Sequence, residues 1–353
     1  MSDPNSCYPS VSPLAKRRRM VKLPAVKILC CGFFPALQRT IEYASFRPYE
    51  VNTARNITLF VGGKATNTTR VLKTLGADPL MLSFIGGGNG KTVRALLAAE
   101  HHPCRWVETQ AETRICQTLL AADTGSMTEL VEDTAPLSAG EWKTFVKTFA
   151  QIQLDFDRII FSGNLPPHAP QDIYAELLSL TDGKKVLIDS CGAPLLAALK
   201  YRPAVVKINA EELALTIKTP DEVTRPMGAV SVDRAISPGE IQHLTEELMS
   251  LGAGAVGITH GKEQAMLFQP GASYTFTVPQ IKALNPIGSG DSVSAGTAFA
   301  LAKGRSLVEA FVFGLACGTS NAMNIKPGMV KLDQIAELVP KILQNHCCNP
   351  INR

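Results

Sequence analysis

The sequence lacks the features that mark membrane-spanning and secreted proteins. No stretch approaches the roughly 18 consecutive apolar residues of a membrane-spanning helix. The apolar stretch 26–37 follows a basic region, as the core of a secretory signal does, but Lys22, Pro24 and Lys27 interrupt it and no small-residue cleavage site follows. We therefore expect no membrane partner and interpret this stretch as a buried first strand.

Metal-binding and disulfide patterns are also missing, although the chain has nine cysteines. Two pairs are adjacent, Cys30-Cys31 and Cys347-Cys348, and the other cysteines are scattered without any CxxC spacing. This arrangement predicts neither a zinc site nor a disulfide framework. Free thiols suit a reducing compartment, so we expect a cytoplasmic protein.

A strong excess of one charge is absent outside a single segment. The formal net charge is +4, and the basic run at residues 16–19 in a Pro- and Ser-containing stretch accounts for it. The rest of the chain is close to neutral, so nucleic acid is not an expected partner. A targeting or phosphate-binding patch is one interpretation of the run, but we predict a disordered basic tail over residues 1–25.

Apolar runs alternate with helical patterns along the chain, from KILCCGFF at 27–34 to AEELALTI at 210–217. Strands that are apolar on both faces and separated by helices predict an α/β sandwich with a mostly parallel sheet. Two segments, 39–60 and 104–131, instead alternate polar and apolar residues without a helix, which predicts a small antiparallel sheet over one end. The Pro- and Gly-rich stretch 217–240 is predicted to be a surface excursion.

Both common nucleotide-binding fingerprints are absent, since no GxxxxGK[ST] occurs and no GxGxxG follows a strand near the start. A different turn, NPIGSGDSVSAG at 285–296, leads into a predicted helix. The backbone N–H groups of Gly288, Ser289 and Gly290 would crowd the helix amino terminus and attract an anion. Asp291 beside them either caps the helix or takes the proton of a hydroxyl that attacks a phosphoryl group. The turn alone leaves both interpretations open.

The turn is accompanied by other segments in a fixed order: VGGKATNTTRVLKTLGA at 61–77, SFIGGGNG at 83–90, ETRICQ at 112–117, FSGNLPP at 161–167, LIDSCGAPL at 187–195 and VKINAEEL at 206–213. With them the chain resembles the PfkB (ribokinase-like) family of sugar kinases over residues 28 to about 330, and within it the tagatose-6-phosphate kinase and 1-phosphofructokinase branch. The resemblance implies an ATP- and Mg²⁺-dependent kinase, built as a ribokinase-like three-layer α/β/α sandwich with a small β-sheet lid. We place the kinase domain at residues 26–345, with lid strands within 39–60 and 104–131, and a tail at 346–353.

The resemblance assigns catalytic roles to the turn, with Asp291 as the base and Gly288, Ser289 and Gly290 as the anion hole. It places the sugar between Gly62, Gly63, Asn67 and Asn164. A lysine at position 64 and an arginine at position 114 suit a substrate that already carries a phosphate. Each residue has a structural alternative, because Lys64 and Arg114 can be solvated charges and Asn164 can be a turn residue.

The resemblance also assigns the nucleotide site. It implies that Asn209 and Glu212 organise Mg²⁺ through water, although Asn followed three residues later by Glu is also a helix capping box. The remaining nucleotide contacts are assigned to Lys207, Thr259, Gly261 and Asn321. His260 is interpreted as a tolerated loop histidine.

One departure from the family pattern concerns the sugar hydroxyls. Relatives have an acidic residue in a pattern like NPALD, whereas this chain has FPALQ, which puts Phe34 and Gln38 in those places. Thr53 likewise stands where the branch commonly has arginine. A neutral Gln38 can bind hydroxyls without charge, so the identity of the sugar stays open.

The leading functional hypothesis is transfer of the γ-phosphoryl group of ATP to a hydroxyl of a ketohexose phosphate, of the tagatose 6-phosphate or fructose 1-phosphate type. The alternatives are a kinase for an unphosphorylated sugar or nucleoside, and a catalytically weak regulator that binds sugar phosphates. The exposed face of a small lid sheet needs to be covered, and a homodimer through the lid is one way to cover it.

Overall fold

The computed structural model describes residues 25–163, 165, 168–219, 236–261, 264–344 and 346–350. Apart from its last residue, the predicted tail 1–25 lies outside the described residues. Most of the predicted surface excursion at 217–240 lies outside them as well. Within the described part of the chain, no helix combines the length and apolarity needed to cross a bilayer.

The centre of the molecule is a ten-stranded sheet with the order β14-β13-β12-β11-β10-β9-β8-β1-β4-β5. From β5 to β11 the neighbouring strands are parallel, and β12, β13 and β14 add an antiparallel edge. The strands are β1 (Lys27–Cys31), β4 (Asp78–Gly86), β5 (Cys104–Thr109), β8 (Arg158–Ser162), β9 (Val186–Asp189), β10 (Val205–Asn209), β11 (Val256–Thr259), β12 (Gln264–Gln269), β13 (Ala272–Thr277) and β14 (His346–Pro350). The mostly parallel sheet predicted from the strand–helix alternation is confirmed.

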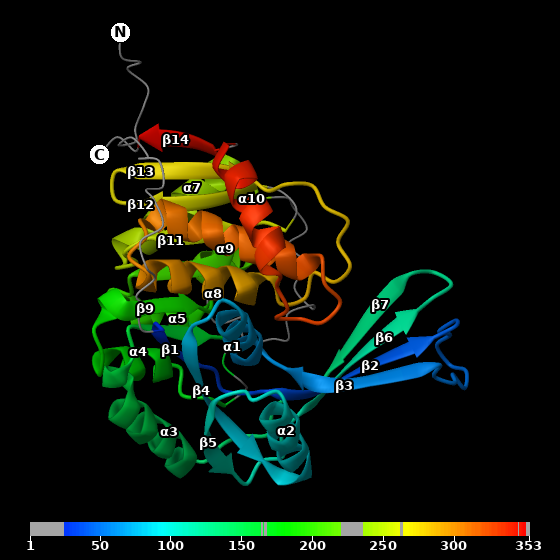
Figure 1. Cartoon of the computed structure of the whole chain (residues 1–353). Coiled ribbons are helices and arrows are strands. Elements are labelled where there is room, and N and C mark those ends of the chain that lie inside the picture. The colour runs from blue at the N-terminus through cyan, green and yellow to red at the C-terminus, as the bar shows by residue number, and fades with distance from the viewer. Residues whose placement is uncertain are drawn as a thin grey trace, which may run out of the picture.

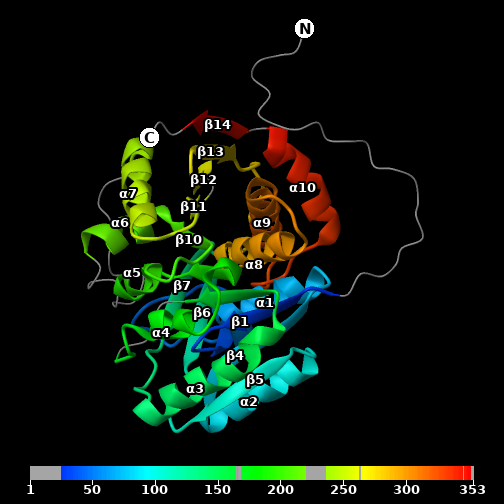
Figure 2. The same cartoon turned by 90° about the vertical axis from the view of Figure 1, so that its left-hand side faces the viewer.

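Helices cover both faces of this sheet, as Figure 2 shows. One layer is α3 (Ala139–Ile152), α4 (Ile173–Ser179), α5 (Ala193–Leu199), α6 (Ala210–Lys218) and α7 (Pro238–Ser250), and the other is α1 (Lys64–Thr74), α8 (Ser289–Ala302), α9 (Leu307–Ala322) and α10 (Leu332–Gln344), with α2 (Gly87–Ala99) beside α1. Single 3₁₀ turns occur at Gln153–Asp155 and Gly183–Lys185. Successive residues of β1 pack against helices on opposite faces of the sheet, since Leu29 belongs to one core cluster and Ile28 to the other.

A separate four-stranded sheet projects from one end of the body (Figure 1). It consists of β2 (Ala36–Tyr43), β3 (Asn56–Gly62), β6 (Ile115–Ala121) and β7 (Ser126–Val131), in the order β3-β2-β6-β7. These strands form the predicted lid, with two corrections. Residues 104–109 form β5 at the edge of the main sheet, and the β2–β6 pair is parallel because both strands leave the body in the same direction.

Two further boundaries differ from the sequence-based expectation. The stretch 26–37 was expected to be one buried strand, but β1 ends at Cys31 and Ala36 already begins lid strand β2. The expected tail at 346–353 contains β14, which pairs with β13 from Phe276↔His346 to Ala272↔Pro350 and so belongs to the main sheet. Backbone pairing at a sheet edge needs no apolar sequence pattern, so HCCNP gave no strand signal.

Candidate active site

The candidate site lies at the carboxyl ends of the parallel strands, where open α/β sheets bind their ligands. Ser162 and Asp189 end neighbouring strands β8 and β9 in register, and Asn209 and Thr259 end β10 and β11 in register. The amino termini of α1 and α8 meet at the same edge of the sheet, since Asn67 of α1 contacts Asp291 of α8. Segments far apart in sequence therefore converge on one place.

The turn before α8 has the conformation that an anion hole requires. Gly288 is the N-cap of α8 with φ 80°, a left-handed conformation that favours glycine. No side chain caps the helix. The Ser289 N–H donates to the Pro286 oxygen at 3.1 Å, so the turn itself uses one of the first N–H groups. A Cβ on Gly290 would lie 2.6 Å from Nζ of Lys207, which shows how closely that lysine approaches the turn.

Asp291 lies in the first turn of α8, and its side chain is directed away from a capping role. It is 7 % exposed, and its Oδ2 accepts a hydrogen bond from Nδ2 of Asn67 at 2.8 Å. Burial raises the pKa of Asp291, with the charges of Lys64 and Asp189 acting in opposite directions, to about 6. A carboxylate with this pKa is mostly ionised at pH 7 and is a better proton acceptor than an ordinary aspartate.

Two lysines share a buried carboxylate beside this base. Nζ of Lys64 lies 3.1 Å from Oδ1 of Asp189, and Nζ of Lys207 lies 3.4 Å from Oδ2. Asp189 is 1 % exposed and also accepts a 2.7 Å hydrogen bond from Oγ of Ser294. Burial alone would raise the pKa of Asp189, but the two ammonium groups lower it to about 2.

The same cluster fixes the charge of Lys64. Burial opposes its charged form, yet the nearby carboxylates, Asp189 first, hold the pKa of Lys64 well above its ordinary value. Its side chain is 33 % exposed, so the ammonium group remains accessible to a ligand. The site therefore presents two cations and a helix amino terminus around one ionisable base.

No role was predicted for Asp189, although it is the shared partner of both lysines. Its sequence signal was its place at the end of an apolar strand in the segment LIDSCGAPL at 187–195, one of the segments that carry the family resemblance.

The residues predicted to bind the sugar lie at the start of α1 and at the base of the lid. Gly63 has φ 117° and precedes α1, and Gly62 ends β3 beside Gln38, whose Oε1 lies 3.3 Å from the position of a Cβ on Gly62. Nε2 of Gln38 donates to Oγ1 of Thr118 at 2.9 Å, which leaves the carbonyl oxygen as an acceptor for a hydroxyl.

Arg114 directly precedes lid strand β6, and its backbone oxygen accepts a hydrogen bond from the N–H of Leu37, the neighbour of Gln38. Its Nε is buried and has no hydrogen-bond partner in the described part of the chain. A buried guanidinium nitrogen without a protein partner fits an anionic ligand. Asn164, predicted to contact the sugar, lies outside the described residues.

The nucleotide side shows both the predicted residues and their structural roles. Asn209 and Glu212 form a capping box at the start of α6, with Glu212 3 % exposed and one carboxylate oxygen accepting from the Asn209 N–H at 3.1 Å. Gly261 has φ 54° in the turn after β11. A cavity of about 310 Å³ lies beside this turn and is lined by Ile236, Pro238, Ile241, Ile258, His260, Gln264, Met266, Thr277, Val278 and Gln280. His260 also lies 3.6 Å from Oε1 of Glu211.

Asn321, predicted to lie in the helix that borders adenine, is in α9 and bonds to the turn before α8. It is fully buried, and its amide donates to the Ile287 oxygen at 2.8 Å and to Oγ of Ser289 at 3.1 Å. Its Oδ1 accepts from the Gly328 N–H at 2.8 Å. These bonds stabilise the turn before α8. Because the Asn321 side chain is fully buried, it cannot contact the adenine of a nucleotide in this conformation.

Among the described residues, no group of three or more His, Cys, Asp or Glu side chains is arranged to hold a metal ion. The carboxylate and amide oxygens of Glu212 and Asn209 are hard donors of the kind that Mg²⁺ accepts, and Mg²⁺ takes few protein ligands because it keeps several waters. The donor set therefore fits a hydrated Mg²⁺ that is also bound by nucleotide phosphates.

An anion hole, two lysines and a buried base at the edge of an α/β sandwich with a β-sheet lid define a phosphotransferase that acts on an alcohol group. The chain belongs to the PfkB family of carbohydrate kinases, because the sequence profile of the pfkB family carbohydrate kinase matches residues 35–324. ATP is the co-substrate that membership of this kinase family implies.

Individual relatives agree with this assignment. The 1-phosphofructokinase of Bacillus subtilis (strain 168) is 28 % identical over 310 residues, which cover 87 % of this chain and 96 % of that protein. A putative phosphofructokinase from Staphylococcus aureus superposes with a TM-score of 0.71 at 25 % identity, covering 92 % of this chain and 99 % of the other. Phosphofructokinase-2 from Escherichia coli, in complex with potassium, has the same fold, with a TM-score of 0.77 at 22 % identity over 90 % of this chain and 99 % of the other. A tetrameric inhibited form of that enzyme has also been solved.

Proposed function

We propose that this chain transfers the γ-phosphoryl group of ATP to a hydroxyl of a ketohexose phosphate, of the fructose 1-phosphate or tagatose 6-phosphate type. The observation that carries the proposal is the buried Asp291 beside an uncapped helix amino terminus and the lysine pair Lys64 and Lys207. The similarity to a 1-phosphofructokinase supports the substrate class.

The proposed mechanism uses a base and fixed positive charge. Asp291 accepts the proton of the attacking hydroxyl, which Asn67 helps to align. The N–H groups of Gly288 and Gly290, the amino terminus of α8 and the ammonium group of Lys207 stabilise the negative charge that develops on the transferred phosphoryl group. The lid excludes water, so that the phosphoryl group passes to the sugar and not to solvent.

Mg²⁺ belongs to the same proposal. Glu212 and Asn209 would hold it through water, and bound Mg²⁺ would neutralise phosphate charge. Thr259 and Gly261 would contact the nucleotide phosphates. The proposal also includes a homodimer through the lid and a cytoplasmic location, which the scattered cysteines without CxxC spacing favour.

Arg114 supports the phosphorylated acceptor, because its buried Nε has no partner in the described part of the chain. Gln38 supports the same substrate class, because a neutral side chain holds sugar hydroxyls less tightly than a carboxylate and leaves more of the binding to the phosphate. The second candidate is a kinase for an unphosphorylated sugar, in which Gln38 would select a different hydroxyl pattern.

The proposal is tested by measuring ADP production with a panel of acceptors. The panel contains fructose 1-phosphate, tagatose 6-phosphate, fructose 6-phosphate, the unphosphorylated sugars and a nucleoside, each with ATP and Mg²⁺. We expect the highest kcat/KM for a ketohexose phosphate. A higher kcat/KM for an unphosphorylated acceptor would move the second candidate to first place, and binding without turnover would favour a sugar-phosphate-binding regulator.

A further inference from the structure

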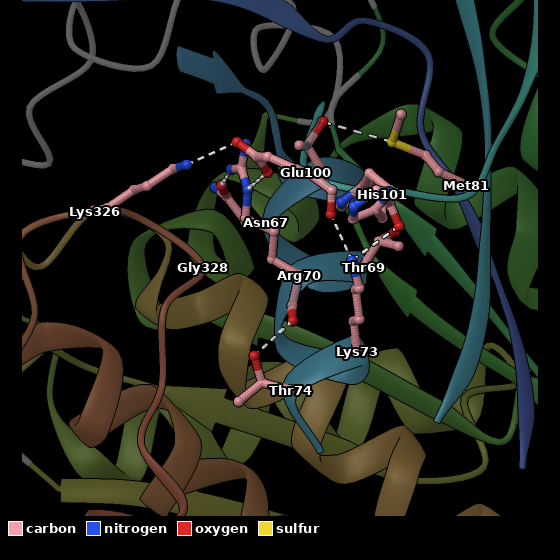
Figure 3. Close-up of polar contacts among 12 residues, drawn as sticks. Asn67, Thr69, Arg70, Lys73, Thr74, Met81, Glu100, His101, Lys326 and Gly328 are labelled. Carbon is pink, nitrogen blue, oxygen red and sulfur yellow. Dashed lines mark hydrogen bonds and ion pairs between the residues drawn. The ribbon is translucent and has the colours of Figure 1, made fainter. Parts of the chain in front are cut away.

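A cluster of three charged residues lies behind the base and outside the residues assigned above. Arg70 of α1 donates to Glu100 through Nε at 2.8 Å and through Nη2 at 3.2 Å. Lys326, in the segment between α9 and α10, donates to the same carboxylate at 2.7 Å (Figure 3). Burial would raise the pKa of Glu100, but its hydrogen bonds to Arg70 and Lys326 lower it to about 2. The cluster is therefore ionised at any pH at which the protein works.

The cluster leads directly to the base through Asn67. The remaining guanidinium nitrogen of Arg70, Nη1, lies 3.4 Å from Oδ1 of Asn67, and Nδ2 of Asn67 donates to Asp291 at 2.8 Å. A guanidinium group only donates and an ionised carboxylate only accepts, so these two neighbours fix which way the amide of Asn67 points. Arg70 is 8 % exposed and Asn67 is 4 % exposed, so water does not compete freely for these bonds.

The segment that carries Lys326 also closes onto the anion-hole turn. Gly328 has φ 75°, and a Cβ there would lie 2.8 Å from Cα of Asn67, so the segment packs directly on that residue. The N–H of Gly328 binds Asn321, which in turn binds Ser289. Asp291 is therefore positioned both by its hydrogen bond from Asn67 and by the turn that precedes it. The segment that carries Lys326 contacts Asn67 directly and contacts the turn through Asn321.

We propose that Arg70 and Glu100 are positioning residues for phosphoryl transfer: the ion cluster orients the amide of Asn67 so that it donates to Asp291 and keeps the base aligned. This inference rests on the proposed role of Asp291 as the base. Loss of the cluster leaves the amide of Asn67 free to rotate, and Asp291 then loses its only amide donor among the described residues.

Loss of the hydrogen bond from Asn67 to Asp291 can be measured from the acid limb of the pH–rate profile, because this limb reports the pKa of the base. The charged groups that face Asp291 are Lys64 from α1, Asp189 from β9 and Lys207 from β10, and the Asn67 hydrogen bond lowers the pKa of Asp291 further. His102 lies near the cluster, but burial lowers its pKa to about 4, outside the range of this limb. A base that loses the Asn67 hydrogen bond titrates at a higher pH.

The decisive variant is Glu100→Gln. It removes a negative charge, so a purely electrostatic effect at a distance would lower the pKa of Asp291, whereas misorientation of Asn67 raises it. We expect the acid limb to move up by about one pH unit, so that kcat falls about fivefold more at pH 6 than near pH 8.5, where the loss reports misalignment of the base alone. Arg70→Met is expected to produce the same shift, and KM for ATP stays close to the wild-type value in both variants.

Lys73→Met is the matched control. Lys73 lies one turn along α1 and binds the backbone oxygens of Glu100 and His101, so the variant removes a nearby positive charge and a contact between the same segments without touching Asn67. An unchanged acid limb is expected. An acid limb that stays in place or moves down in folded Glu100→Gln, or one that moves up equally in Lys73→Met, overturns the inference. Wild-type turnover by Asp291→Asn would instead overturn the proposed function.

Discussion

At the scale of single residues, the proposed mechanism depends most on Asp291. The base has a pKa of about 6, lies beside the uncapped start of α8 and is aligned by Asn67. We expect Asp291→Asn to lower kcat by about 10²- to 10⁴-fold, the range attributed to general-base catalysis. Nucleotide binding, measured by calorimetry with a non-hydrolysable ATP analogue, should remain close to wild type. A variant with near-normal kcat would remove Asp291 from the mechanism.

Arg114 and Lys64 test the substrate class at the same scale. If the acceptor carries a phosphate, Arg114→Met should lower kcat/KM for the phosphorylated sugar about ten- to a hundredfold, since a charge-assisted hydrogen bond contributes about 1.5–3 kcal/mol. The unphosphorylated sugar should be affected little. Lys64→Met is expected to show the same preference if Lys64 leaves Asp189 for the substrate phosphate. Arg105→Met, an exposed arginine on β5, is the control. Equal losses on both acceptors would contradict the phosphosugar proposal.

The residues that the sequence identified and those it missed differ in a physical way. Asp291 was predicted as the base because its turn is encoded locally by Gly288 and Gly290, and because the family resemblance decided between the base and the helix cap. Asp189 was missed because its importance comes from Lys64 and Lys207, which are 125 and 18 residues away in sequence. The buried position of Asn321 was missed for the same reason, since its partner Gly328 is recognised only in the folded chain.

At the scale of elements, the lid sheet has one face with exposed apolar side chains. Directly paired residues share a face of a sheet, so the pairs Ile41↔Ile57, Ile41↔Leu119 and Leu119↔Thr128 place Ile57, Leu59 and Leu130 on one side. Their exposed fractions are 48 %, 42 % and 47 %. Gln38 is on the other side of the lid, so this apolar face is directed away from the sugar residues.

We expect this face to form a dimer in solution. The double variant Leu59→Lys and Leu130→Lys should place like charges across the interface and convert the dimer to a monomer, as measured by sedimentation velocity. Met127→Lys, on the opposite face of β7, is the matched control and should leave the sedimentation coefficient unchanged. A wild-type protein that sediments as a monomer at micromolar concentration would refute the expectation.

The sequence predicted the lid but not its limits. Residues 104–109 mix polar and apolar side chains as the lid strands do, although β5 belongs to the edge of the main sheet and only Val107 in it is buried. Period-two alternation reports that one face is exposed, and it does not say to which sheet a strand belongs. The helices were predicted more reliably, since α6 begins with a capping box that can be recognised directly from Asn209 and Glu212.

At the scale of the whole molecule, ionisation of the buried Asp291 lowers the free energy of unfolding at neutral pH. The folded-state pKa of Asp291 is about 6, above the unfolded value of about 3.9, so its ionisation opposes folding at neutral pH and the penalty disappears as the pH falls towards about 4. Asp291→Asn should therefore be more stable than wild type by up to about 2–3 kcal/mol at pH 7, with no difference near pH 4. Urea unfolding at both pH values measures this.

The difference in unfolding free energy between wild type and Asp291→Asn reports the contribution of Asp291 alone. Asp189 has its pKa lowered to about 2, so it stabilises the fold above the unfolded pKa and loses that contribution as the pH falls towards about 2, equally in both proteins. Asp155→Asn, at an exposed position, should give no difference at either pH. A variant that is less stable than wild type at pH 7 would show that Asp291 is not strained by burial.

The closure of the segment 323–331 onto α1 has a consequence for the order in which the protein becomes active during synthesis. Asn67 and Asp291 are 224 residues apart, and Glu100 and Lys326 are 226 residues apart. A chain emerging from the ribosome therefore contains the lid strands and the residues proposed to bind the sugar long before Asp291 and the segment 323–331 have been synthesised. Such long-range pairing makes folding slow, and no nascent chain that ends before about residue 330 can assemble the site. Incomplete translation products of this protein should be catalytically silent rather than partly active.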